Sequence, residues 1–379
     1  MYLSNDFGEF LMKKLFYIFV FFTFTSLISA QTETPRFPVE NSNGEWFIEN
    51  AERTGDVRFA DFLGQRALWL KNNTQVMRAG LEFTDGIIEF DVAPMDRSNF
   101  FAVIFRREGF QNHENIYFRI HRSGLYNALQ YAPRINGSST WQLYPEFNTA
   151  VDLPRNQWTH VKSEVQGEKL DIYLNNAPKP ALSVSRLRHQ SAKGTVGFWA
   201  RVNDQPTIWS AAISNISIRP GASPKSISTV RGDLPKGTIS NWEVGGAVQT
   251  EKGSVTKLPP INNWKKAETE ESGLINLNRS FGFLRGRWTA FARTNIKSAE
   301  AKKALLELGY SDDVTIFLNG EAVYSGINGF ESRHPEYMGF VKPEFENVFL
   351  NLRSGDNELI LAVTDDQRFG WGFAARLKE

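Results

Sequence analysis

The chain of 379 residues is too long for one small core and fits two domains of ordinary size. Its 43 Lys and Arg residues nearly balance 42 Asp and Glu residues, so the net charge of +1 favours neither nucleic acid nor an anionic membrane surface as a partner. Cysteine is absent, which excludes disulfides and a lipoprotein anchor, and the 30 Phe and 10 Trp residues favour strands.

Residues 1–30 have the pattern of a secretory signal peptide. Lys13 and Lys14 form a short basic region, an apolar segment follows over residues 15–22, and Ala30 is a small residue at the expected cleavage site. Met12 fits the initiator, so residues 1–11 are interpreted as an extension ahead of it. The apolar segment is shorter than the roughly 20 residues that a membrane span requires. We therefore expect a secreted, periplasmic or cell-surface protein with no membrane span after cleavage.

Residues 46–219 are predicted to form a β-sandwich. A polar leader with proline, residues 31–45, comes first. Short apolar segments then alternate with breaks rich in Gly, Pro and Asn, which is the spacing of strands and turns in a sandwich. Residues 220–237 contain Pro, Gly and Ser with little apolar content, and we interpret them as a linker.

Residues 238–379 are predicted to form a second all-β sandwich. Asn319 and Gly320 lie between two alternating apolar segments, which is a strong hairpin signal. The segment 296–309 fits either a helix or a loop that leads into a strand over 304–308. The overall prediction is an all-β fold of two β-sandwich (jelly-roll) domains in series.

Two sequence patterns resemble known families. The form W-x-x-V…G…L-x-I-Y-x-N, from Trp158 to Asn175, resembles the central hairpin of laminin-G and concanavalin A-like lectin/glucanase domains. Residues 316–372 follow the form L-N-G…L-x-x-G-x-N-x-L…G-W-G, which resembles the galactose-binding-like jelly rolls of secreted glycoside hydrolases and esterases. The first resemblance implies a sheet face that binds a glycan or a protein. The second implies that a structural calcium could be held by loop carboxylates, for which Asp312–Asp313 and Asp365–Asp366 are the candidates.

A catalytic motif of the glucanase branch is incomplete in this chain. That branch carries its nucleophile and acid on one strand as E-x-D-x-x-E, and the two carboxylates flank the scissile bond. Glu89 and Asp91 begin the pattern, but Pro94 occupies the position of the second glutamate. We therefore assign no catalytic residue. If Glu89 and Asp91 have no catalytic role, they are two solvated carboxylates on an outer sheet face.

Period-2 alternation predicts a mixed aromatic and arginine surface on the first sandwich. If Phe118 and Phe198 face the core, then Tyr117, Arg119 and His121 lie on the outer face, and so do Trp199 and Arg201. Aromatic rings stack on sugar rings, while Arg, His and carboxylates donate or accept directed hydrogen bonds. The predicted ligand-binding residues are Glu89, Asp91, Tyr117, Arg119, His121, Trp141, Trp199 and Arg201. The alternative is that this face packs against the second domain.

The favoured function is therefore an exported carbohydrate-binding protein whose partner is a glycan or polysaccharide. Two alternatives remain open. One is a glycoside hydrolase or polysaccharide lyase whose site would use Glu89, Asp91, His121 and Glu114, and the other is a module that docks proteins at the cell surface. The five histidines have no metal-binding spacing, and no metal site or other cofactor is predicted beyond the calcium already named. The oligomeric state is left open.

Overall fold

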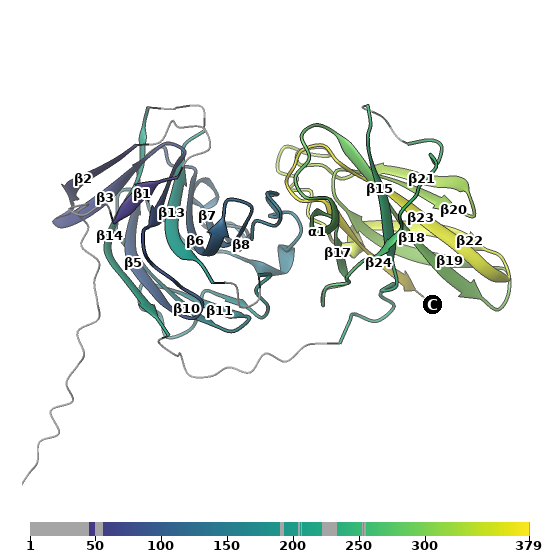
Figure 1. Ribbon diagram of the computed structural model, residues 1–379, viewed down its shortest axis with the longest axis horizontal. Helices are drawn as coiled ribbons and strands as arrows, with labels where there is room; N and C mark the ends of the chain where they lie inside the picture. Colours follow the sequence, from purple (N-terminus) through teal and green to yellow (C-terminus); the bar gives the residue numbers. More distant parts are fainter. Residues whose placement is uncertain are drawn as a thin grey trace, which may run out of the picture. The chain divides into compact units, whose positions relative to one another are not determined.

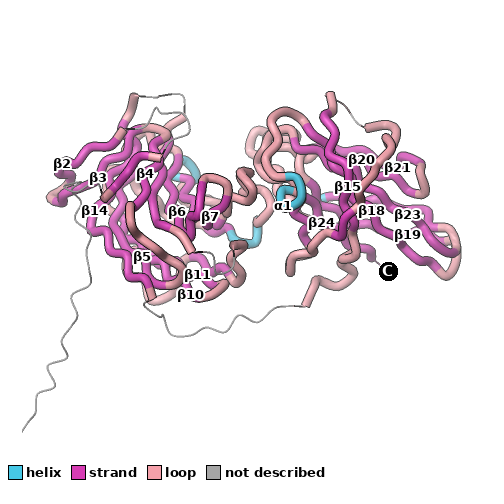
Figure 2. The backbone as a smooth tube through the Cα atoms, viewed as in Figure 1, coloured by secondary structure: helices cyan, strands magenta, loops and turns pink. Residues whose placement is uncertain are grey.

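Short strands, many of them with alternating buried and exposed side chains, pair antiparallel through most of the described residues (Figure 1). The computed structural model describes residues 45–49, 56–189, 193–203, 205, 207–221, 233–251, 253 and 255–378. The predicted signal peptide, most of the leader and most of the linker lie outside these residues. The described helical segments are short (Figure 2): α1 spans Asn278–Phe281, and 3-10 turns span Ile120–Arg122, Pro145–Phe147 and Pro343–Phe345. None of these described segments is long and apolar enough to cross a membrane.

Residues 46–220 form two seven-stranded sheets. The first sheet has the strand order β1-β4-β13-β6-β7-β8-β9, and the second has the order β12-β11-β10-β5-β14-β3-β2. The strands of the first sheet are β1 Trp46–Ile48, β4 Thr74–Arg78, β6 Phe100–Gly109, β7 Asn112–Arg119, β8 Leu129–Tyr131, β9 Asn148–Thr149 and β13 Thr195–Arg201. Those of the second sheet are β2 Val57–Phe62, β3 Gln65–Lys71, β5 Gly86–Pro94, β10 Thr159–Gln166, β11 Lys169–Leu174, β12 Leu182–Val184 and β14 Trp209–Pro220. Figure 1 shows β5 and β14 in one layer and β6, β7 and β13 in the facing layer.

These two sheets share one apolar core. Phe118 on β7 and Phe198 on β13 lie in it, and the Phe198 ring centroid is 5.1 Å from that of Phe90 on β5. Their neighbours Tyr117 and Trp199 are less buried and lie on the outer face of the first sheet. The alternation predicted for β7 and β13 is therefore confirmed.

Residues 243–378 form a second sandwich from a six-stranded third sheet and a four-stranded fourth sheet. Their strand orders are β16-β15-β18-β23-β20-β21 and β17-β24-β19-β22. The third sheet contains β15 Glu243–Gln249, β16 Lys265–Lys266, β18 Trp288–Ser298, β20 Asp313–Leu318, β21 Glu321–Ile327 and β23 Gly355–Asp365. The fourth contains β17 Leu274–Asn276, β19 Lys302–Tyr310, β22 Glu346–Leu352 and β24 Gly372–Lys378. The all-β fold of two β-sandwiches in series is confirmed.

Local predictions in the second sandwich can be compared with these strands. The hairpin at Asn319 and Gly320 is confirmed, and both residues have positive φ angles, 52° and 87°, as the tight turn between β20 and β21 requires. The segment 296–309, which fitted either a helix or a loop leading into a strand over 304–308, consists of the end of β18, a short connection and most of β19, so the helix is wrong. Trp371 is fully buried in the core of this sandwich, so it closes the core and is not exposed to a ligand.

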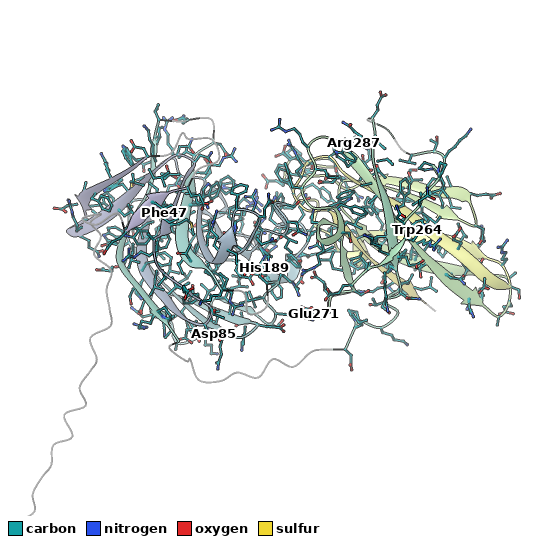
Figure 3. All side chains as sticks on the ribbon, viewed as in Figure 1. Phe47, Asp85, His189, Trp264, Glu271 and Arg287 are labelled. Carbon is teal, nitrogen blue, oxygen red and sulfur yellow. The ribbon has the colours of Figure 1, made fainter. Side chains whose placement is uncertain are left out.

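Buried polar contacts join the two sandwiches. Arg188 lies 3.2 Å from a carboxylate oxygen of Glu270 and 2.7 Å from one of Glu271, which is labelled in Figure 3. Asn278 donates to the Ser138 hydroxyl over 2.8 Å. The described residues of both sandwiches accordingly belong to one compact unit. The division into independently folding domains at 46–219 and 238–379 stays a prediction.

Candidate functional site

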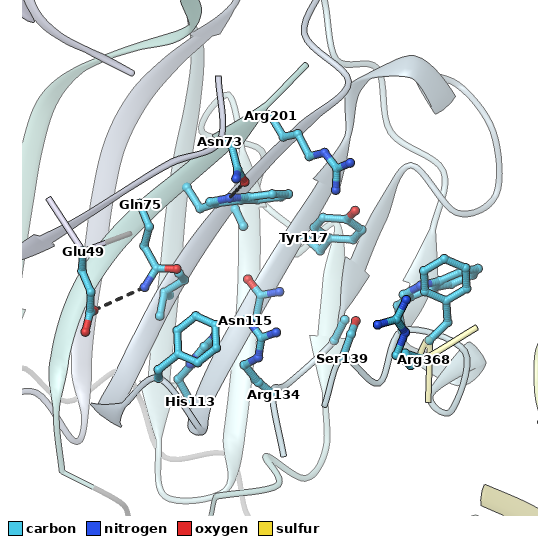
Figure 4. A pocket seen from close by; sticks show the side chains of 17 residues that line it. Glu49, Asn73, Gln75, His113, Asn115, Tyr117, Arg134, Ser139, Arg201 and Arg368 are labelled. Atoms are coloured by element: carbon cyan, nitrogen blue, oxygen red, sulfur yellow. Dashed lines mark hydrogen bonds between the residues drawn. The ribbon is translucent and has the colours of Figure 1, made fainter. Parts of the chain in front are cut away.

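A pocket of about 370 Å³ lies on the outer face of the first sheet, over β13, β6 and β7 (Figure 4). Its floor is formed by three residues in direct cross-strand register: Trp199 pairs with Ala102, and Ala102 pairs with Tyr117. Alanine has only a Cβ, so no large side chain of β6 rises between the two rings at this position. The strand register therefore creates an aromatic-flanked depression that no single strand would form.

The aromatic rings of this floor are nearly parallel. The Tyr117 and Trp199 centroids are 6.2 Å apart at an interplanar angle of 27°, and Phe100 packs beside both at 5.3 and 6.3 Å. The Trp199 Nε1 donates to Asn73 Oδ1 over 3.2 Å, which fixes the orientation of the indole. Burial raises the pKa of the Tyr117 hydroxyl, so it stays protonated at neutral pH. These contacts hold an ordered apolar surface at the pocket.

One end of the pocket is polar. His113 and Asn115 lie four and two residues before Tyr117 on β7. Because side chains alternate with a period of two, all three lie on the same face. The buried His113 Nδ1 and Asn115 Oδ1 have no hydrogen-bond partner among the described residues. Burial first, and then the charges of Arg134 and Arg107, lower the pKa of His113 well below 6.5, so its imidazole is neutral at pH 7. A buried polar atom without a partner costs about 1–3 kcal/mol, which a ligand hydroxyl would recover.

Charged groups complete the lining. Arg134, Arg201 and Arg368 contribute guanidinium groups, and Glu49 is the single carboxylate among the described lining residues. Arg134 Nε donates to the Gly137 carbonyl over 3.1 Å, and its guanidinium carbon lies 4.3 Å from the Phe110 ring centroid.

The structure brings four of the eight predicted site residues into this pocket. Tyr117, Trp141, Trp199 and Arg201 line it. His121 lies in a 3-10 turn just after β7, and its ring packs against Phe100 at 4.7 Å without lining the pocket.

Arg119 and Trp141 are partly covered by the second sandwich. The Arg119 side chain is buried, 5.2 Å from the Trp141 ring centroid and 3.5 Å from the sulfur of Met338. Trp141 also contacts three aromatic rings of the second sandwich at 5.2–5.8 Å, namely Phe330, Phe340 and Phe369. The alternative of packing against the second sandwich therefore applies to this end of the face, whereas the Tyr117–Trp199 end remains a pocket.

Glu89 and Asp91 lie elsewhere, on the outer face of the second sheet. His160 contacts both, at 2.6 Å from Asp91 Oδ1 and 3.1 Å from Glu89 Oε1. Asn215 donates to Asp91 and Arg219 to Glu89 over 2.6 and 3.0 Å. This network accounts for both carboxylates, and the structure does not bring them together with the pocket.

Glu114, the other carboxylate considered for catalysis, is in the interior. Its side chain is fully buried, accepts a hydrogen bond of 2.5 Å from Tyr131 and another of 3.0 Å from the backbone N–H of His189. The four residues of the enzymatic alternative therefore lie in three separate places.

Sequence reasoning missed several lining residues. His113 and Asn115 share the period of Tyr117 and could have been found by extending the alternation of β7 backwards. Arg134 lies in an isolated bridge opposite His113 and Arg368 in an irregular segment, so no strand periodicity indicates their direction.

One residue of each acidic pair of the second sandwich caps a turn, and the other, Asp313 or Asp366, forms an ion pair with Arg287. Asp312 Oδ2 accepts the backbone N–H groups of Asp366 and Gln367 over 2.6 and 2.7 Å, and Asp365 Oδ1 accepts that of Arg368 over 2.9 Å. Burial raises the pKa of Asp312 to about 6 and that of Asp365 to about 7. Among the residues that the structure describes, no group of three or more His, Cys, Asp or Glu side chains could hold a metal ion.

Comparisons with known proteins give structural similarities alone. No protein-family model and no curated protein sequence matches the chain. A carbohydrate-binding module of family 66 from Bacillus subtilis aligns with 14% identity over 46% of this chain and 95% of its own, with a TM-score of 0.35. A Bacillus subtilis protein with a galectin-like fold aligns with 12% identity over 50% and 96%, with a TM-score of 0.38. A Bacillus licheniformis β-glucanase aligns with 12% identity over 49% and 97%, with a TM-score of 0.34. At this level of similarity none of the three assigns a ligand to this chain.

Proposed function

We propose that the chain is a carbohydrate-binding protein that holds a glycan in the pocket over β13, β6 and β7. The observation that carries this proposal is the floor of Trp199, Ala102 and Tyr117, in which two nearly parallel rings line one pocket. Sugar rings present apolar C–H faces that stack on aromatic rings, and hydroxyls at their edges that need hydrogen-bond partners. At the polar end, the His113 Nδ1 and the Asn115 Oδ1 are buried polar atoms without a hydrogen-bond partner among the described residues.

Binding without catalysis fits the carboxylates of the pocket. Glycoside hydrolysis by the usual mechanism needs two carboxyl groups roughly 5–10 Å apart across the scissile bond. Glu49 is the one carboxylate among the described lining residues, and it is held in an ion pair with Arg107. A single, already paired carboxylate supports recognition better than hydrolysis. The signal-like residues 1–30 lead us to place this binding outside the cytoplasm.

A glycan array probed with residues 31–379 tests the proposal, followed by calorimetric titration of each positive glycan. Trp199→Ala removes the ring from the floor and should abolish or strongly weaken binding. Phe349→Ala is the matched control, because Phe349 is an aromatic residue on β22, far more exposed (68%) and outside the pocket. If no glycan binds, or if both variants lose affinity equally, the proposed function is wrong.

A further inference from the structure

We propose that the ligand of this pocket is an acidic saccharide, whose carboxylate or sulfate is bound by Arg134, Arg201 and Arg368. This inference rests on the proposed function and narrows the class of glycan. The three arginines come from separate parts of the chain: the segment after β8, the end of β13 and the segment before β24. Figure 4 shows their guanidinium groups on three sides of the same pocket.

Many arginines of the chain have a carboxylate partner, whereas the three pocket arginines have none among the described residues. Arg188 and Arg287, for example, each lie within 3.2 Å of a carboxylate oxygen. None of the three pocket arginines forms an ion pair within 4.0 Å with a carboxylate in the described part of the chain. Exposed arginines elsewhere can be solvated singly, but these three line one pocket, and we infer that a ligand supplies their counter-charge there.

The remaining lining residues do not cancel this charge. Three arginines and one glutamate leave a formal charge of +2 on the lining, and Glu49 is already paired with Arg107. His113 does not add to the charge, since its lowered pKa keeps it neutral. The pocket therefore offers unsatisfied positive charge beside a stacking surface.

Arg134 is the arginine that most needs an anion. Its side chain is half-buried, with the Phe110 ring on one side and the Gly137 carbonyl as one hydrogen-bond acceptor. Burial and repulsion by Arg107 lower the pKa of Arg134, which means that its positive charge is not compensated by the protein. Arginine binds carboxylate and sulfate oxygens through two parallel N–H donors, and such charge-assisted bonds are roughly twice as strong as neutral ones.

Three probes of equal length separate the outcomes: an oligouronate, the same oligomer with its carboxylates converted to methyl esters, and a sulfated neutral oligosaccharide. We expect the mature chain to bind at least one acidic probe about ten- to hundredfold more tightly than the ester, and the affinity to fall as salt rises. The stronger of the two acidic probes identifies the anion. If the ester binds as tightly as both acidic probes, the acidic inference is overturned and the proposed function stands. If none of the three probes binds and the array is also negative, the proposed function itself fails.

Substitutions of single arginines test whether the acidic probe binds in this pocket. Arg201→Gln and Arg368→Gln change exposed side chains, so they should fold normally, and each should weaken the acidic probe about tenfold and the ester by a clearly smaller factor. Arg97→Gln, an exposed arginine of the same sandwich outside the pocket, is the matched control and should change nothing. Equal losses in all three variants would show that general charge attraction, rather than this pocket, binds the anion, and would overturn the assignment.

Discussion

Substituting two adjacent residues of β13 separates the pocket from the core. Phe198 is fully buried, and its ring contacts those of Trp46, Phe90 and Phe101 at centroid distances of 5.1–6.0 Å. Phe198→Ala should lower the free energy of unfolding by about 3–5 kcal/mol, because truncation leaves a cavity that the neighbouring rings cannot fill. For a sandwich of this size that corresponds to a fall in Tm on the order of 10 °C.

Trp199→Ala should lower glycan affinity more than it lowers stability. Trp199 is partly exposed, so its loss removes one hydrogen bond to Asn73 and the stacking beside Tyr117, at about 1–2 kcal/mol of stability. Glycan affinity should fall by about 1–3 kcal/mol, the scale of a central aromatic contact. Thermal melts and calorimetric titration of both variants measure the two quantities. If Trp199→Ala unfolds the protein and Phe198→Ala leaves it stable, the register of β13 is inverted and the assignment of Trp199 to a binding pocket is wrong.

Three further predictions concern other parts of the chain. Burial raises the pKa of Asp365 to about 7. The folded protein therefore keeps this proton up to about pH 7, whereas the unfolded chain loses it near pH 4. The free energy of unfolding should decrease as pH rises from about 4 to 7. Urea unfolding at both pH values should show a smaller decrease in Asp365→Asn, and an identical decrease would contradict the burial argument. Mass spectrometry of the exported protein should find its first residue at or near Gln31, whereas retention of residues 15–22 would contradict the signal peptide. Limited proteolysis should cut first within residues 220–235 and give two stable fragments, and primary cleavage inside residues 90–210 would count against that domain boundary.

The sequence predicts the inner and outer faces of individual strands because a strand has a fixed period of two residues. Tyr117 and Trp199 were placed on an outer face by their buried neighbours Phe118 and Phe198, and the structure agrees. The same reasoning cannot decide which strands share a sheet. Glu89 is on an outer face, as expected, but β5 belongs to the second sheet and β7 to the first.

Contacts between distant segments explain the remaining differences. Trp141 and Arg119 are covered by Phe330 and Met338, which lie about two hundred residues further along the chain. Local alternation carries no information on such packing. Arg368 reaches the pocket from the second sandwich for the same reason, through a turn whose backbone is held by Asp365.

The buried ion pairs between the sandwiches bear on how this chain could have been assembled and diversified. If the first sandwich were recombined with another module that lacks Glu270 and Glu271, Arg188 would keep its contact with Glu146 at 3.8 Å but lose its two shorter ion pairs, a loss of up to about 3–5 kcal/mol. The hybrid would also lose Arg368 and Phe369 from the pocket. Although each sandwich has its own core, we therefore expect the two to be inherited together rather than recombined separately with domains of unrelated proteins.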